Sequence, residues 1–393
     1  MQYYCNNCES KISDNDKAYK AKDTQRGLSV YVCSCCSLVQ SLPRIDKVTR
    51  KVRAVSGGAD WGNIRYGKGF RAEYAISFIK EYKDFGKFKN VIDIGSNRGV
   101  FLQKFHQFNL SAKLVGVEPD ISIKDCYKSL PFIELHIERI ENMSFRENTF
   151  DLVHCSHTLE HLADPAEVLK KMWSSIKPDG LMFLEVPNLG FISNKDVVEE
   201  FFIDKHLYHY SEKCFEELLY ITGYEILKKA IDVENLTYLV TPNNKIKDVT
   251  SINGVECDNR SDLVCNRIYT YAANLELAEK YLNSVSKTIL SYSPKKVVIW
   301  GAGRLFDLLF KYGELKAGSL HGLIDANLGD YISHVHDIPI LPPHSLSQLQ
   351  PDIVVIASRT YFTEIKEYIL ENSDVPIKIV GLMDLLEEAQ NES

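Results

Sequence analysis

The stretch Val91-Ile92-Asp93-Ile94-Gly95-Ser96-Asn97-Arg98-Gly99 decides the fold of the central part of this chain. Its first residues form a buried-strand pattern, the glycines end the strand in a turn, and a helical pattern follows. Glycines in such a turn let the backbone approach a ligand closely, and the N–H groups at the start of the helix point toward that ligand. The next apolar run ends in Glu118, which is placed to accept hydrogen bonds from both hydroxyls of a ribose. The alternative for Asp93 is a strand-end carboxylate that caps the helix.

Apolar runs alternate with helical patterns on both sides of this stretch, which predicts a parallel α/β sheet. Within residues 88–240 the expected strands are 90–94, 114–117, 150–155 and 181–186. A second series starts at Lys295, with expected strands 297–300, 320–324, 353–357 and 377–380. The predicted fold class is therefore α/β, with two tandem Rossmann-like parallel-sheet domains.

Length and composition limit the kind of protein this is. The chain has 393 residues, enough for two or three domains, and its 45% hydrophobic and 25% charged residues are typical of a globular protein. Its net charge of −7 argues against a general nucleic-acid binder. Because the chain opens without a basic and then apolar run, and has no apolar stretch of ~20 residues, we expect a cytoplasmic protein without a membrane span.

The ten cysteines are unevenly distributed, and five of them lie within the first 36 residues. Cys5 with Cys8, and Cys33 with Cys36, form two pairs in which two residues separate the cysteines. Such spacing lets four thiolates converge on one tetrahedral zinc ion with a structural role. Free buried thiols or a redox pair are the alternatives, and Cys35 is an alternative ligand to Cys33 or Cys36.

These patterns divide the chain into five parts. Residues 1–45 are the predicted small zinc-binding module, and residues 46–87 are a connector with a helix expected to cover the substrate. Residues 88–240 hold the first sheet, residues 241–294 are a linker with an amphipathic helix, and residues 295–393 hold the second sheet.

Four motifs occur in order in the first sheet: D-I-G-S-N-R-G at 93–99, G-V-E-P-D at 116–120, F-D-L-V-H-C-S-H-T-L-E-H-L-A-D-P at 150–165 and I-K-P-D-G-L-M-F-L-E-V-P-N at 176–188. They resemble those of class I S-adenosylmethionine-dependent methyltransferases. The resemblance covers roughly residues 88–240 and implies S-adenosylmethionine as cofactor. The residues that it assigns to the cofactor are Asp93, Gly95, Asn97, Gly99, Glu118, Ile140, Ser156 and His157.

A methyl group on a sulfonium is already activated, so the enzyme mainly needs alignment and a base for the acceptor. Histidine is the natural base near neutral pH. We expect His206 to be this base, with His209 and His157 also in the catalytic set and Tyr208 in contact with the substrate. The alternative is that the aromatic residues around His206 only pack a lid.

Upstream, Arg65, Lys68 and Arg71 recur every three residues, which places them on one helical face next to Tyr66. We expect Arg65, Tyr66 and Lys68 to bind a diphosphate or a carboxylate of the substrate. A solvated basic face is the alternative.

The second sheet also begins with a strand, a glycine turn and a helix at Val297–Arg304, and Asp325 follows its next strand. Phe306 stands where a dinucleotide fingerprint needs a small residue, so a structural or substrate-covering role is favoured over nucleotide binding.

The order of modules resembles that of the sugar C-methyltransferases, which act on nucleotide-linked keto-sugars. That family has Tyr-His-Glu-His in its catalytic loop, whereas Ile203, Asp204, Lys205 and His206 stand here. We therefore expect methyl transfer to an oxygen of a sugar or nucleotide-linked sugar in surface-glycan biosynthesis, without a nucleic-acid partner. Carbon methylation of a nucleotide keto-sugar and a non-catalytic binding protein are the alternatives.

Overall fold

The computed structural model describes residues 2–21, 27–43, 70–192, 201–202, 205–243, 245–246, 261–330, 333–358, 361–373 and 375–392. The chain divides into two compact units, and the described residues up to Tyr269 belong to the first. Those from Thr270 onward belong to the second. Within the described residues, no helix combines the length and the apolar character that crossing a membrane requires.

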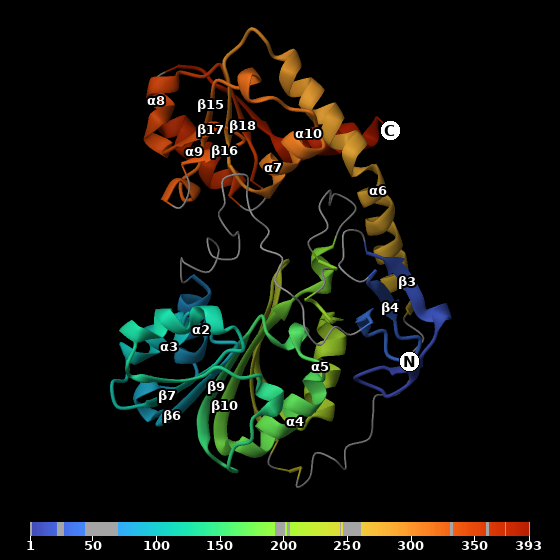
Figure 1. The fold of residues 1–393 in the computed structure, drawn as a ribbon, viewed down its shortest axis with the longest axis vertical. Coiled ribbons are helices and arrows are strands. Elements are labelled where there is room, and N and C mark those ends of the chain that lie inside the picture. The colour runs from blue at the N-terminus through green and yellow to red at the C-terminus, as the bar shows by residue number, and fades with distance from the viewer. Residues whose placement is uncertain are drawn as a thin grey trace. The chain divides into compact units, whose positions relative to one another are not determined.

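A seven-stranded sheet forms the centre of the first unit, in the order β12-β13-β10-β9-β6-β7-β8 (Figure 1). Its strands are β6 (Asn90–Ile94), β7 (Lys113–Val117), β8 (Ile133–His136), β9 (Phe150–Ser156), β10 (Ile176–Pro187), β12 (Tyr224–Ile231) and β13 (Asn235–Pro242). The four strands expected from the sequence are present and pair in parallel. One edge of the sheet adds two strands that the sequence analysis did not name, because β12 and β13 form an antiparallel hairpin that also pairs antiparallel with β10. Strands joined by a turn this short can only pair antiparallel.

Helices cover both faces of this sheet, which explains why its central strands are continuous apolar runs. Figure 1 shows α2 (Phe70–Lys80) and α3 (Val100–His106) on one side, and α4 (Pro165–Ser175) and α5 (Glu212–Ile221) on the other. The first pair packs on side chains such as Phe183, and the second on side chains such as Leu184, the next residue of β10. This packing on both faces holds the strands in place, and with them the loops at their carboxyl ends.

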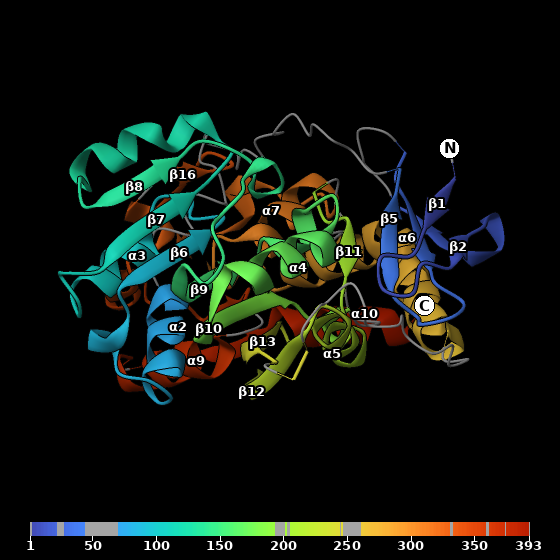
Figure 2. The same cartoon turned by 90° about the horizontal axis from the view of Figure 1, so that it is seen from below.

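The cysteine-rich module contributes five short strands to the same unit. They are β1 (Tyr3–Tyr4), β2 (Lys11–Ile12), β3 (Lys17–Lys20), β4 (Ser29–Val32) and β5 (Val39–Leu42). The sheet order β11-β5-β4-β3 includes a strand from far along the chain, β11 (Tyr208–His209), which lies beside β5 in Figure 2. The module is therefore bonded through its backbone to the segment that follows His206.

The second unit contains a six-stranded sheet in the order β16-β17-β15-β14-β18-β19. Its elements are β14 (Val297–Trp300), α7 (Arg304–Lys311), β15 (Gly322–Ile324), β16 (His334–Val335), β17 (Ile338–Leu341), α8 (Leu346–Leu349), β18 (Ile353–Ile356), α9 (Phe362–Glu371), β19 (Lys378–Gly381) and α10 (Leu382–Asn391). The long helix α6 (Ser261–Ser291) precedes them. Asp325, after β15, accepts a hydrogen bond of 3.0 Å from the backbone N–H of Ala302 in the glycine turn. This carboxylate therefore fixes the turn of its own sheet.

Asp151 on β9 gives the first sheet a pH-dependent stability. Its carboxylate accepts hydrogen bonds from the backbone N–H groups of Lys89 and Asn90, at 2.9 and 2.8 Å, and from Nζ of Lys177 at 2.7 Å. Burial alone would raise the pKa of Asp151, but these partners lower it below its ordinary value. Because the pKa is lower in the folded state, the stabilisation is present above about pH 4 and is lost as the pH falls through the folded-state pKa.

We expect Asp151→Asn to lower the free energy of unfolding by about 2 kcal/mol at pH 7, because charge-assisted hydrogen bonds are lost. At pH 3 the loss should be smaller, and urea denaturation at the two pH values measures both. Asp179→Asn is the matched control, since Asp179 lies on β10 with a side chain that is 83% exposed. Equal losses in the two variants would contradict this assignment.

Candidate active site

The loop after β6 has the tight form that the sequence predicts. Gly95, Asn97 and Gly99 adopt φ values of +76°, +44° and +73°, a left-handed region that glycine and asparagine tolerate. A Cβ added at Gly95 would overlap Oγ1 of Thr158, which donates a hydrogen bond of 3.2 Å to the carbonyl oxygen of Ile94. Gly95 therefore lets the loop that follows β9 cross directly over the end of β6.

The side chain of Glu118, after β7, has a fixed orientation beside this loop. Its carboxylate accepts hydrogen bonds from the backbone N–H of Asn97 at 3.1 Å and from that of Asp120 at 3.0 Å. Burial raises the pKa of Glu118 above its ordinary value, although the hydrogen bonds act in the opposite direction. Each oxygen retains a lone pair, so the carboxylate can still accept from a ribose hydroxyl.

Asp93, at the end of β6, is buried and paired with a histidine of the neighbouring strand. Its Oδ1 lies 2.6 Å from Nδ1 of His154, whose ring stacks on Phe101 with centroids 3.7 Å apart. His154 is thus packed within the sheet and holds the Asp93 carboxylate in place.

Ile140 is buried at the start of the short helix that follows β8.

The loops that carry the predicted cofactor residues follow β6, β7, β8 and β9, and they meet at one edge of the sheet because these strands are parallel. The residues fit S-adenosylmethionine in kind. Gly95 and Gly99 in the first loop have left-handed backbones, and the buried carboxylate of Asp93 lies at the end of the strand before it. The carboxylate of Glu118, held in orientation by hydrogen bonds, follows the next strand.

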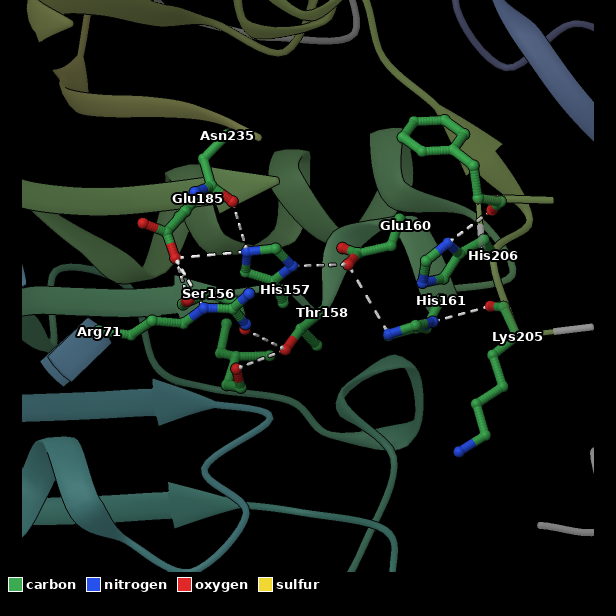
Figure 3. Close-up of polar contacts among 12 residues, drawn as sticks. Arg71, Ser156, His157, Thr158, Glu160, His161, Glu185, Lys205, His206 and Asn235 are labelled. Carbon is green, nitrogen blue, oxygen red and sulfur yellow. Dashed lines mark hydrogen bonds and ion pairs between the residues drawn. The ribbon is translucent and has the colours of Figure 1, made fainter. Parts of the chain in front are cut away.

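His157 follows β9 at this edge and is surrounded by acidic groups (Figure 3). Its Nε2 lies 2.9 Å from Oδ1 of Asn235 and 3.4 Å from Oε1 of Glu185, while its Nδ1 lies 3.6 Å from Oε1 of Glu160. Because an amide oxygen only accepts hydrogen bonds, Nε2 carries a proton and Nδ1 holds the lone pair of the neutral ring. Burial and the charge of Arg71 would lower the pKa of His157, but the two carboxylates raise it above its ordinary value.

The backbone of His157 has a φ of +47°, which is uncommon for a residue that is not glycine. Its N–H donates a hydrogen bond of 2.8 Å to the carbonyl oxygen of Glu185, which helps to hold this conformation. Such backbone strain concentrates at functional sites.

Glu185, at the end of β10, connects His157 to two further polar side chains. Its Oε1 accepts a hydrogen bond of 2.9 Å from Oγ of Ser156 and lies 3.9 Å from Nε of Arg71. Burial alone would raise the pKa of Glu185, but its bonds and charge interactions with His157 and Arg71 lower it. The buried carboxylate of Glu185 is therefore negatively charged and contacts both Ser156 and His157.

Glu160, on the 3-10 helix Leu159–His161, lies between His157 and His161, with His206 nearby (Figure 3). Burial alone would raise the pKa of Glu160, but the neighbouring imidazoles lower it to about 2. Burial lowers the pKa of His206 to about 3. An imidazole of such low basicity is a weak general base at neutral pH, which argues against the role expected for His206.

Burial also argues against two other roles that the sequence predicts, those of His209 and Tyr208. His209 is 2% exposed, and its Nε2 lies 2.8 Å from Oγ of Ser41 in the cysteine module. Tyr208 is 1% exposed, and its hydroxyl donates a hydrogen bond of 2.9 Å to the carbonyl oxygen of Ala163. Both side chains are enclosed by the protein, which argues against catalysis by His209 and substrate binding by Tyr208. Arg65, Tyr66 and Lys68 lie outside the described residues.

The four paired cysteines of the module converge. Sγ of Cys5 lies 3.4 Å from Sγ of Cys36, Sγ of Cys8 lies 3.5 Å from Sγ of Cys33, and all four sulfurs lie within 4.8 Å of one another. Cys35 is not part of this cluster. The donor set and the spacing fit tetrahedral zinc, for which each zinc–sulfur bond is about 2.3 Å long.

Sequence reasoning missed Glu185 and Asn235 as members of the site. Glu185 is an acidic residue inside the apolar run at 181–186. Because charged residues are rarely buried, a carboxylate inside a predicted buried strand could have indicated a functional site. Asn235 reaches the site only through the hairpin β12–β13, which the sequence did not reveal.

Comparison with known proteins agrees with this geometry. Residues 68–229 match the family model described as a methyltransferase domain. This domain, with its loops after β6, β7 and β9, is a class I S-adenosylmethionine-dependent methyltransferase domain. Residues 293–380 match a second family model, described as C2185-like, N-terminal.

The curated relatives include tRNA U34 carboxymethyltransferases. That of Campylobacter lari is 30% identical over 118 residues, which cover 28% of this chain and 39% of the relative. That of Campylobacter curvus is 28% identical over 103 residues, which cover 25% and 34%. The match thus spans less than half the length of either relative.

Solved structures with a similar fold include S-adenosylmethionine-dependent methyltransferases of two bacteria. The protein of Mesorhizobium loti is 12% identical, with 43% of this chain and 97% of that chain covered and a TM-score of 0.37. The protein of Aquifex aeolicus is 15% identical, with 43% and 89% covered and a TM-score of 0.35.

Proposed function

We propose that this protein transfers a methyl group from S-adenosylmethionine to a hydroxyl of a sugar or nucleotide-linked sugar. The observation that carries the proposal is the histidine at the end of β9: the lone pair on Nδ1 of His157 and the oriented carboxylate of Glu118 lie at the same sheet edge. When bound, S-adenosylmethionine supplies a methyl group on a positively charged sulfur, which leaves as a neutral thioether.

In this reaction His157, and not His206, accepts the proton. The acceptor oxygen forms its bond to the methyl carbon as the carbon–sulfur bond breaks, and its proton passes to Nδ1 of His157. Asn235 holds the opposite nitrogen at 2.9 Å, which fixes the tautomer that can accept a proton. Glu160, whose Oε1 lies 3.6 Å from Nδ1, stabilises the imidazolium that results.

We expect His157→Asn to lower kcat by about 100-fold or more, because asparagine tolerates the left-handed backbone but is not a base. The dissociation constant of S-adenosylmethionine should change by less than about threefold. His344→Asn, at an exposed position of the second unit, is the matched control and should leave kcat unchanged. A His157→Asn enzyme with normal kcat would exclude His157 as the proton acceptor.

The four cysteines bind one zinc ion in this proposal, and its role is structural. Four sulfur ligands close the coordination sphere, which leaves no open position for a substrate. The module has little apolar core of its own, so the zinc supplies folding free energy.

The proposal of a sugar acceptor rests on the resemblance in the order of modules. The net charge of −7 argues against a tRNA substrate, since a protein that binds tRNA generally has a basic surface. The names of the curated relatives favour a second candidate, modification of tRNA. The same names raise carboxymethyl transfer as an alternative to methyl transfer.

One experiment separates these reactions. The full chain is incubated with S-adenosylmethionine labelled in the methyl group, together with a panel of sugar nucleotides or with total tRNA. Label in a sugar supports the proposal, and label in tRNA alone overturns it. Mass spectrometry of the product distinguishes a methyl from a carboxymethyl group, and solvent deuterium next to a ketone would indicate carbon methylation. Absence of S-adenosylmethionine binding in calorimetry would favour a non-catalytic protein.

A further inference from the structure

A second group of potential metal ligands lies in the first unit, apart from the four cysteines. It consists of one carboxylate oxygen of Glu160 and one ring nitrogen each of His161 and His206, all within 4.8 Å of one another. Figure 3 shows the three side chains turned toward a common point. Glu160 and His161 come from the 3-10 helix after β9, and His206 precedes β11.

Backbone carbonyl groups fix the tautomers of both histidines. Nδ1 of His161 lies 2.8 Å from the carbonyl oxygen of Lys205, and Nδ1 of His206 lies 2.9 Å from that of Phe201. A carbonyl oxygen can only accept a hydrogen bond, so each Nδ1 carries a proton and donates it. The neutral rings therefore present the lone pairs of both Nε2 atoms toward Glu160.

Glu160 adds further lone pairs to the same space. Its side chain is 1% exposed, and neither of its oxygens has a hydrogen-bond partner among the described residues. The ring nitrogens beside its Oε1, Nδ1 of His157 and Nε2 of His161, lie 3.6 and 3.7 Å away, beyond hydrogen-bond distance. A buried carboxylate without a donor is strongly destabilising unless a positive charge compensates it.

We propose that Glu160, His161 and His206 bind a divalent transition-metal ion of the zinc type, separate from the zinc of the four cysteines. Two ligands that are each about 2.1 Å from a tetrahedral ion lie roughly 3.4 Å apart, close to the spacing of Glu160 and His161. Two histidines and one carboxylate are an established ligand set for such ions, with a fourth position left open. The carbonyl partners at Nδ1 are the outer contacts that orient metal-binding histidines.

The open position would accept a water molecule or an oxygen of the acceptor. Glu160 has a part in both proposals, because it also lies 3.6 Å from Nδ1 of His157. Metal binding is nevertheless tested separately from the proposed function, because it is measured as metal content and its ligands include neither His157 nor a residue assigned to the cofactor. The competing explanation is a proton shared between the histidines, which would neutralise Glu160 without any metal.

The test uses the full chain, purified without chelators, and measures metal content by mass spectrometry. We expect two zinc equivalents in the wild type, one in Glu160→Gln and in His161→Phe, and one in Cys8→Ser. His157→Asn is the matched control, since it removes a neighbouring histidine that is not in the proposed set, and it should retain two. Circular dichroism confirms that each variant is folded.

Cobalt titration then identifies the site that each variant loses. Cobalt at the four cysteines produces a thiolate charge-transfer band, and cobalt at the second site does not. We expect Glu160→Gln and His161→Phe to keep this band and to weaken the second binding event by more than ~100-fold. A wild type that binds one metal equivalent, or variants that match the wild type in stoichiometry and affinity, would overturn the proposal in favour of the shared proton.

Discussion

Cys8→Ser should abolish zinc binding by the cysteine module and lower the stability of the whole first unit. Structural zinc contributes about 10–16 kcal/mol in small domains, and loss of one of four ligands removes a large part of this. We expect a two-step thermal transition in which the module melts first. Its melting temperature should be at least ~10 °C below that of the wild-type protein. Differential scanning calorimetry, together with zinc analysis, measures the effect.

The loss should extend beyond the module because β11 is a strand of its sheet. The backbone N–H of Ser41 donates to the carbonyl oxygen of Leu207 at 2.9 Å, and Sγ of Cys214 on α5 donates to the carbonyl oxygen of Cys36 at 3.3 Å. Hydrogen exchange should therefore increase in residues 205–210 of Cys8→Ser. Cys126→Ser is the control, since Cys126 is outside the cluster. A Cys8→Ser protein with normal zinc content and an unchanged melting curve would exclude the zinc assignment.

Gly95→Ala should weaken the binding of S-adenosylmethionine by at least ~100-fold. The added Cβ overlaps Oγ1 of Thr158, and alanine at a φ of +76° is strained, so the loops after β6 and β9 must both move. Isothermal titration calorimetry measures the dissociation constant.

Two further variants separate the steric clash from the backbone strain. Gly95→Ala combined with Thr158→Ala removes the overlaps with Oγ1 and Cγ2 of Thr158, leaves only a tight contact of 3.0 Å with the Cβ of residue 158, and keeps the strained φ, so it should recover part of the affinity. Gly318→Ala is the control, because a Cβ at Gly318 meets no atom within 4 Å. An unchanged dissociation constant in Gly95→Ala would show that this loop does not form the cofactor site.

The positions of the central strands along the chain could be predicted because each strand is encoded by a local pattern. Strand 90–94 and its glycine turn are encoded by neighbouring residues, since a parallel strand covered on both faces must be apolar throughout. The edge hairpin β12–β13 was missed because its first strand carries Lys228 and Lys229 and does not read as buried. His154 is packed because it lies within the apolar run of β9.

The catalytic assignment shows where sequence patterns are insufficient. His206, Tyr208 and His209 lie within four residues of one another and are chemically suited to catalysis, but the structure buries Tyr208 and His209, and burial lowers the pKa of His206. His209 and Tyr208 are enclosed when β11 joins the cysteine module, and that pairing connects residues about 170 positions apart.

The sequence by itself determined the α/β class, the glycine turn after β6 and the grouping of the four cysteines, because each depends on residue types at short spacing. Only the tertiary structure placed Glu160, Glu185 and Asn235 around His157, and His161 beside His206. The reason is physical: short-range patterns specify strands, turns and ligand pairs, whereas the pKa and the tautomer of a side chain depend on charges and carbonyl groups that distant strands bring to it.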